Sequence, residues 1–165
     1  MRYRWDDGIV HAGGTEVATT DAHFWGRSPH VRVGGADWMF RIEREGLVGA
    51  LEGVDRLALE RGRIWHSSWR FDGLHGPLRL TRTTSWLIGK LYFDLDRDGE
   101  RVAEIAPYGP WRYRPSLELE VEGALEHAEA VFLVWAAFRI DARRPQSRIQ
   151  GGPTAAGGSS GVTVG

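Results

Sequence analysis

Residues 124–140 read Ala-Leu-Glu-His-Ala-Glu-Ala-Val-Phe-Leu-Val-Trp-Ala-Ala-Phe-Arg-Ile, and this stretch decides which folds are open to the chain. It is rich in helix-forming residues and lacks the alternation of a strand, so it predicts a helix. The first half carries Glu126, His127 and Glu129, whereas the second half is apolar on every side. A helix that is apolar all round must be buried all round. In a chain of 165 residues, the place for such a helix is the inside of a curved or closed sheet.

The residues before this helix have the patterns of strands. In 116–122, three apolar residues alternate strictly with three glutamates, which is the period of two of a half-buried strand. Asp98-Gly99 is a hairpin signal, with 101–105 as the returning strand. Further strands are expected at 30–33, 38–43, 63–71, 77–84 and 86–94. Residues 47–61 stay ambiguous, because their leucines have rough helical spacing but glycines interrupt them.

Together these patterns predict a mainly β protein, a closed antiparallel β-barrel enclosing a hydrophobic C-terminal central helix. Residues 1–36 are Gly-rich and are expected to form an irregular N-terminal segment. Residues 37–141 are expected to form the core of the barrel, with the central helix at about 124–140. Residues 142–165 start basic and end in a Gly/Ser-rich run, which predicts a disordered tail.

Composition narrows the function classes. With 21 Lys and Arg against 22 Asp and Glu, the net charge is -1, which disfavours a nucleic-acid partner bound through bulk charge. The absence of cysteine excludes disulfides, thiol nucleophiles and thiolate metal sites. The longest apolar run, 130–138, is far below the roughly 20 residues of a membrane-spanning helix. The start of the chain shows no secretory signal pattern, so a cytoplasmic or peripheral membrane location is expected.

The order of a hairpin over 92–105, an alternating strand and a buried helix ending in Arg139-Ile140-Asp141 resembles the Tubby C-terminal-like superfamily. That superfamily groups Tubby, the plant LURP-one-related proteins and the phospholipid scramblases, and the resemblance covers residues 38–141. It implies a twelve-stranded barrel around a central hydrophobic helix. It also implies a link to membranes, since Tubby binds phosphoinositides and scramblases are linked to membranes and calcium. The chain departs from the scramblases in having no cysteine and only part of their acidic segment.

Two groups of basic residues are candidate contacts for an anionic lipid. The segment 107–115 places Arg112 and Arg114 among aromatic residues, which suits a membrane interface. The alternative is a loop whose rings cap one end of the barrel and make cation–π contacts with the arginines. Arg79, Arg82 and Lys90 lie on adjacent predicted strands and could form a basic patch. The alternative is scattered surface charge facing Asp and Glu across the sheet.

The remaining motifs do not predict an enzyme, a metal site or a cofactor. Residues 94–99 resemble the opening of an EF-hand loop, but its twelfth position is Ile105 and the flanks read as strands, so a hairpin turn is the better interpretation. The six histidines have no metal-ligand spacing, and no nucleophile elbow, phosphate loop or dinucleotide fingerprint is present. An enzyme built from end loops would have to use residues such as His66, His75 and Glu104.

The sequence therefore predicts a non-catalytic binding module that associates with an anionic phospholipid or a membrane surface. The first alternative is a lipocalin-like barrel with an open lumen for a small hydrophobic ligand, which requires the helix at 124–140 to pack outside the sheet. The second is a soluble protein-interaction domain.

Overall fold

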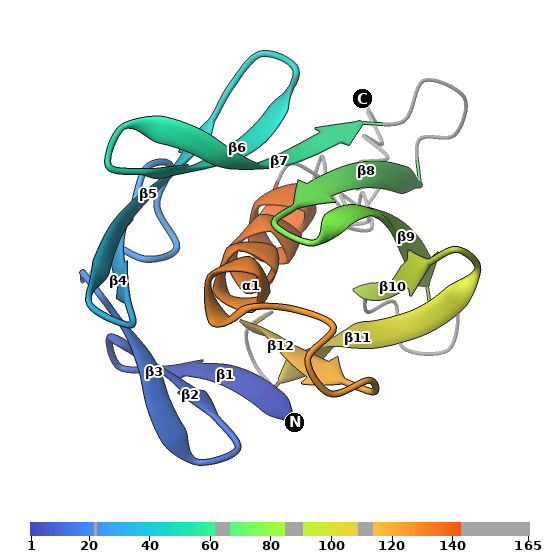
Figure 1. Ribbon diagram of the computed structural model, residues 1–165, viewed down its shortest axis with the longest axis horizontal. Helices are drawn as coiled ribbons and strands as arrows, with labels where there is room; N and C mark the ends of the chain where they lie inside the picture. The colour runs from blue at the N-terminus through green and yellow to red at the C-terminus, as the bar shows by residue number, and fades with distance from the viewer. Residues whose placement is uncertain (22, 62–66, 85–90, 109–113, 143–165) are drawn as a thin grey trace, which may run out of the picture.

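The computed structural model of the protein describes residues 1–21, 23–61, 67–84, 91–108 and 114–142. Twelve antiparallel strands close into a barrel, each beside its neighbours in sequence, and β1 pairs with β12 to complete the ring (Figure 1). The strands are β1 (Arg2–Asp6), β2 (Ile9–Ala12), β3 (Thr15–Thr20), β4 (His30–Val33), β5 (Ala36–Ile42), β6 (Gly46–Leu51), β7 (Val54–Arg61), β8 (Ser68–Gly73), β9 (Gly76–Thr84), β10 (Leu91–Arg97), β11 (Glu100–Tyr108) and β12 (Arg114–Leu119).

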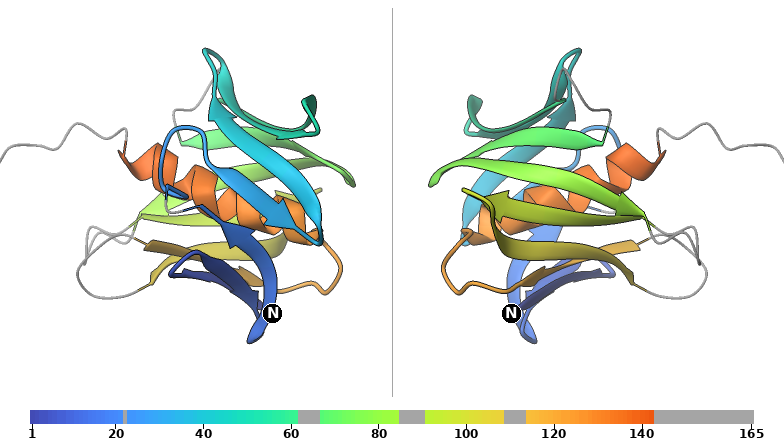
Figure 2. Two further views of the ribbon diagram at one scale, coloured as in Figure 1. Left: turned by 90° about the vertical axis from the view of Figure 1, so that its left-hand side faces the viewer. Right: turned by 90° about the vertical axis from the view of Figure 1, so that its right-hand side faces the viewer.

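The single described helix, α1 (His127–Ala142), runs through the lumen of the barrel (Figures 1 and 2). Every side chain from Ala130 to Ala137 is fully buried. The predicted barrel with an enclosed C-terminal helix is therefore confirmed, with α1 beginning three residues later than expected. Because α1 occupies the lumen, the alternative of an open, lipocalin-like lumen does not apply. Among the described residues, no helix has the length and apolar character needed to span a membrane.

The core is the contact between α1 and the inward side chains of the strands. Phe132 is its centre, with its ring centroid 5.2 Å from that of Phe40 and 5.9 Å from that of Phe71. Trp135 lies 5.6 Å from Phe40 and donates its indole N–H to the carbonyl of Gly26 at 3.0 Å. Rings from β5 and β8 thus meet on one helix residue, and α1 is apolar on every side because the strands of the closed barrel surround it.

The prediction of an irregular segment at 1–36 is wrong, because these residues form β1 to β4 and a third of the barrel wall. Their inward residues, such as Tyr3, Val10 and Val31, are almost completely buried. The predicted strand at 30–33 is confirmed as β4, whereas β1 to β3 were missed because they have only four to six residues each, too few to show a period of two clearly. Glycine pairs between the strands also looked like irregular chain.

Two hairpin turns in the structure decide two further predictions made from the sequence. Residues 47–61, left ambiguous by sequence, form β6 and β7, which are joined at Glu52 and Gly53 with φ values of 51° and 82°. The predicted hairpin at Asp98-Gly99 is confirmed as the β10–β11 turn, with φ values of 52° and 89°. A positive φ at both residues of a turn is typical of two-residue hairpin turns. The predicted tail lies, from residue 143 onward, outside the described residues.

Candidate functional site

The two ends of the barrel differ in construction. At the end where α1 begins, here called the hairpin end, two-residue turns join β2 to β3, β4 to β5, β6 to β7, β8 to β9 and β10 to β11. At the other end, here called the loop end, α1 finishes and longer connections join the remaining pairs, apart from the tight β1–β2 turn. Figure 1 looks onto the hairpin end, and Figure 2 shows α1 running from one end to the other. The longer connections therefore concentrate at the loop end.

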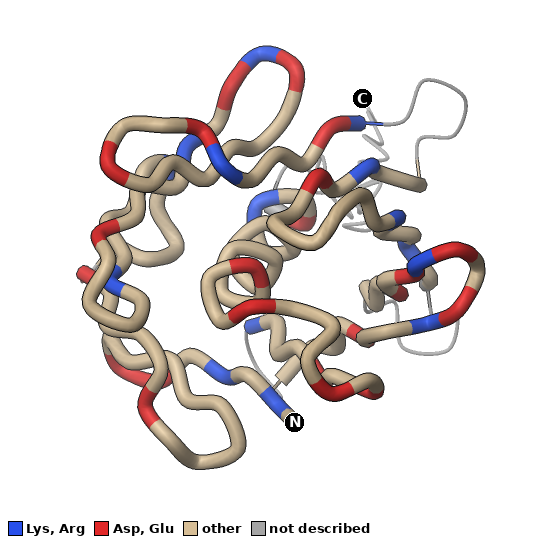
Figure 3. The backbone as a smooth tube through the Cα atoms, in the orientation of Figure 1, with Lys and Arg blue, Asp and Glu red and all other residues tan. Residues whose placement is uncertain are grey.

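Charge differs between the described barrel and the segments outside it. Of the 21 Lys and Arg residues, six lie outside the described segments, so the described residues contain 15 Lys and Arg and all 22 Asp and Glu. Figure 3 marks the positions of these charged residues along the described backbone. The chain enters and leaves the segments that hold these six at the loop end, at the ends of β7 to β12 and of α1. The described barrel is thus acidic, and the cationic excess belongs to segments attached to its loop end. The six residues are Arg63, Lys90, Arg112, Arg143, Arg144 and Arg148.

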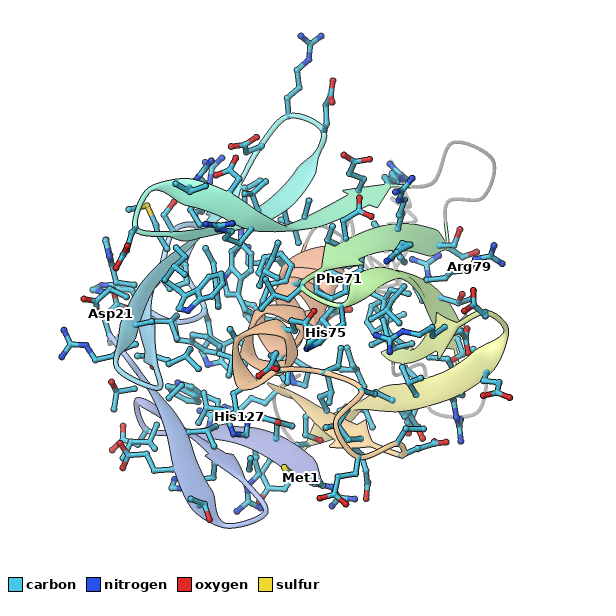
Figure 4. The ribbon with its side chains drawn as sticks, viewed as in Figure 1. Met1, Asp21, Phe71, His75, Arg79 and His127 are labelled. Carbon is cyan, nitrogen blue, oxygen red and sulfur yellow. The ribbon has the colours of Figure 1, made fainter. Side chains whose placement is uncertain are left out.

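The predicted patch of Arg79 and Arg82 is corrected by the register of β9. Arg79 pairs with Asp96 and with Arg70 on the outer wall, where Figure 4 shows its side chain pointing away from the barrel. Arg82 pairs with the buried Phe93 and therefore lies on the inward face of β9, near the loop end. Residues three apart in a strand point to opposite faces, so these two arginines do not form one patch. Lys90, the third member, lies outside the described residues.

Arg114 lies where the segment 107–115 enters β12, at the loop end. Its guanidinium carbon is 5.3 Å from the centre of the Trp5 ring on β1. Arg4, also on β1, reaches the other way, with its guanidinium 4.6 Å from the centre of the Tyr108 ring and a 2.7 Å hydrogen bond to the Tyr108 hydroxyl. Arg114 thus makes a cation–π contact, but with a ring of β1 rather than with a ring of its own segment. Arg112 lies outside the described residues.

Aromatic side chains at the loop end form a group, here called the aromatic rim, that the sequence did not predict. Its members are Trp5, Phe24, Trp25 and Phe138. Trp5 stacks on Phe24 at 6.1 Å, and Trp25 packs against Phe138 of α1 at 4.7 Å. The Arg139 guanidinium donates to the Trp25 carbonyl at 3.2 Å, so the connection between β3 and β4 is fastened to the last turns of α1. The available signal was the Phe24-Trp25 pair in an otherwise polar connection.

At the hairpin end, polar contacts hold the start of α1. The buried carboxylate of Glu129 accepts hydrogen bonds from the backbone N–H of Glu126 and of Leu74, each at 2.7 Å. The first bond is the glutamate half of a capping box, and the second ties the helix to the β8–β9 turn. His75, in that turn, lies 3.0 Å from the Glu126 carboxylate. These contacts fix the helix in the lumen and explain the polar first half of the helical sequence.

Tyr3 and His127 form a second contact at this end. The Tyr3 hydroxyl is 2.8 Å from His127 Nδ1, and the tyrosine is almost completely buried. Burial raises the pKa of the Tyr3 hydroxyl, and the nearby Glu126 carboxylate raises it further. His127 thus helps to hold the helix entry, and Figure 4 shows His75 and His127 on either side of it.

Of the residues that an end-loop enzyme would use, the two described ones are not brought together. His75 is at the hairpin end, whereas Glu104 is on β11 beside Arg101 of the outer wall, and His66 lies outside the described residues. In the EF-hand-like segment, Asp94 accepts a hydrogen bond from Arg101 at 3.3 Å. In the described part of the chain, no three His, Asp or Glu side chains are placed to hold a metal ion.

A pocket of about 330 Å³ lies at the hairpin end between the β10–β11 turn and the connection from β12 to α1. Three carboxylates line it, together with one arginine and apolar side chains. An acidic pocket repels a phosphate group, so it is not the place for an anionic headgroup. Its charged lining residues are Arg97, Asp98, Glu100 and Glu122.

The fold and the rim define a closed antiparallel β-barrel filled by its own C-terminal helix, with arginines and aromatic rings at one end. Comparisons with protein-family models, curated proteins and solved structures found no match. The resemblance to the Tubby C-terminal-like superfamily therefore stays a prediction.

Proposed function

We propose that this barrel is a non-catalytic binding module that associates with anionic phospholipid surfaces through its loop end, as a peripheral protein of the cytoplasmic side. The observation that carries the proposal is the difference in charge between the described barrel and the segments that leave its loop end. The described barrel is acidic, while all the Lys and Arg outside it belong to segments attached to the loop end. Those segments contain no Asp or Glu.

This distribution of charge favours one orientation of the molecule at an anionic membrane surface. Anionic lipid attracts basic segments by about 1 kcal/mol for each Lys or Arg near the surface, within roughly one Debye length. The acidic hairpin end is repelled by the same surface, so the loop end is the one that approaches it. Trp25, half-buried at the loop end, and the exposed Tyr108 suit the interface between headgroups and acyl chains.

The position of α1 supports a surface function over an internal one. Because the helix fills the lumen, a ligand must bind outside the wall or at an end of the barrel. The acidic pocket at the hairpin end does not suit an anion, so the loop end is favoured. A soluble protein-interaction domain is the alternative, and the experiment below separates the two.

The test is flotation of the full chain with vesicles of neutral phosphatidylcholine or of phosphatidylcholine mixed with phosphatidylglycerol, at low and high salt. We expect binding to the anionic vesicles only, reduced at high salt because ions screen the attraction. Arg82→Ala, at the loop end, should weaken binding by about fivefold. Arg79→Ala is the matched control on the same strand, and its outward position on the wall predicts no change.

Binding to neither vesicle would overturn the membrane proposal and leave the protein-interaction domain. Equal binding to both vesicles would overturn the electrostatic argument, because neutral lipid offers no net attraction to basic segments. An equal loss in the Arg79 and Arg82 variants would show that the outer wall, rather than the loop end, meets the lipid.

A further inference from the structure

The pocket at the hairpin end lies between two segments of the chain, the β10–β11 turn and the β12–α1 connection. Its apolar lining consists of Val102 and Ala124, which are buried, and Val121, which is 48% exposed. Five of the eight lining residues are exposed, so the pocket is an open depression rather than a closed chamber.

Three carboxylates of this pocket have no cationic partner. Asp98, Glu100 and Glu122 form no ion pair with any Lys, Arg or His of the described segments. On the outer wall, by contrast, Glu118 and Glu120 are each paired with an arginine. The pocket carboxylates therefore remain available to a ligand.

Arg97 also lines the pocket, but its guanidinium is turned to a different partner. It donates to the Ala124 carbonyl at 3.2 Å, and its Nε is buried without an acceptor. The guanidinium thus fastens the β12–α1 connection to the β10–β11 turn instead of pairing with a carboxylate. Three carboxylates against one guanidinium give the lining a net charge of -2, which attracts a cation.

The arrangement of the lining favours an organic cation over a metal ion. In the described segments, no three His, Asp or Glu side chains are placed to hold a metal, so the pocket carboxylates do not converge on one point. An organic cation can span separated carboxylates while its aliphatic part covers apolar surface such as Val121. The side chains of Lys and Arg have this structure, with an aliphatic stem and a charged head.

The open shape of the pocket favours a side chain of a partner protein over a free small molecule. A small-molecule site buries about 70–90% of its ligand's surface, and a pocket with five exposed lining residues encloses less. A basic side chain that projects from a partner needs only its stem and head to be covered, because its backbone stays on the partner.

We propose that the hairpin-end pocket binds a Lys or Arg side chain of a basic protein segment. The carboxylates of Asp98, Glu100 and Glu122 attract the charged head, and Val121 covers the aliphatic stem. The pocket is at the opposite end of the barrel from the loop end. The proposal therefore does not depend on membrane association, and it adds a protein partner on the side that faces away from a membrane.

The test is fluorescence anisotropy of a labelled, acetylated and amidated six-residue peptide of alternating lysine and leucine, mixed with the full chain without vesicles at low and high salt. We expect saturable binding that high salt weakens, because ions screen the attraction. The same peptide with glutamate in place of lysine should not bind, since the pocket carboxylates repel it.

Variants locate the binding surface. The double variant Glu100→Gln/Glu122→Gln removes two pocket charges and should weaken peptide binding by about tenfold. The matched control Glu16→Gln/Glu52→Gln removes the same charge from exposed positions outside the lining and should change binding by less than about twofold. Val121→Ser should weaken binding by about threefold through lost apolar contact. Urea unfolding of each variant checks that the barrel is intact.

Equal losses in the two double variants would show a general attraction to negative charge and overturn the pocket as the site. Absence of peptide binding to the wild type would overturn the proposal and leave the membrane function to be decided by vesicle flotation. Self-association of the full chain in sedimentation, abolished by Glu100→Gln/Glu122→Gln and unaccompanied by peptide binding, would assign the pocket to a second copy and overturn the partner protein.

Discussion

Replacing Glu129 by glutamine tests whether one buried carboxylate fastens the central helix to the wall. In the native protein, its two oxygens accept the N–H of Leu74 in the β8–β9 turn and the N–H of Glu126 at the start of α1, each at 2.7 Å. Glutamine keeps the size of the side chain but offers one acceptor oxygen, and its amide NH₂ faces the other backbone N–H. One buried donor is then left unpaired and the remaining bond loses its charge assistance.

The expected loss follows from these two bonds. An unpaired buried donor costs about 1–3 kcal/mol, and loss of a capping interaction costs about 1 kcal/mol. We therefore expect Glu129→Gln to lower the free energy of unfolding by about 2–4 kcal/mol. Glu129→Ala should cost more, because it leaves both donors unpaired and opens a cavity.

The assay is urea unfolding followed by circular dichroism, with the slope of the transition checked for constancy. Glu122→Gln, at an exposed position of the β12–α1 connection, is the matched control and should change stability by less than about 0.5 kcal/mol. If Glu129→Gln behaves like this control, the carboxylate does not fasten the helix and the reasoning fails.

Three further predictions concern the core and the helix entry. Phe132→Ala should destabilise the barrel by about 3–5 kcal/mol in urea unfolding, because its buried ring packs against Phe40 of β5 and Phe71 of β8; a loss below about 1 kcal/mol would contradict this central role. The fluorescence assigned to Trp135, taken as the difference between wild type and Trp135→Phe, should resist acrylamide quenching, and ready quenching would place this indole outside the lumen. The raised pKa of Tyr3 means that its folded state holds the proton longer, so its contribution to stability is present below about pH 10 and is lost as pH rises through the folded value. Tyr3→Phe should therefore lose less stability than wild type when urea unfolding is moved from about pH 9 to about pH 11, and an equal loss would contradict the shift.

The helix and the barrel around it could be predicted because their signal is local and long. An apolar surface on every side of residues 130–138 requires burial on every side, whatever the rest of the chain does. The alternating strand at 116–122 and the Asp98-Gly99 turn carry equally local signals. The first three strands could not be predicted, because strands of four to six residues separated by tight glycine turns show too few periods to read.

The contacts of the candidate site could not be predicted, because they join residues that are far apart in the sequence. Arg114 was predicted from its own neighbourhood of aromatic residues, but the ring that it contacts, Trp5, lies at the other end of the described chain. Arg4 was missed because its partner, Tyr108, is 104 residues away in sequence. Arg79 and Arg82 were grouped because they are close in sequence, although β9 turns them to opposite faces.

The sequence by itself thus determined that a helix must be enclosed by a sheet, since burial of an apolar surface depends on composition and period alone. Tertiary structure decided which ends of the strands meet, and with them the loop end, the aromatic rim and the seam between β1 and β12. Closing a barrel joins the first strand to the last, and no local pattern encodes which side chains then lie together. The contacts of Arg4 with Tyr108 and of Arg114 with Trp5 are products of that closure.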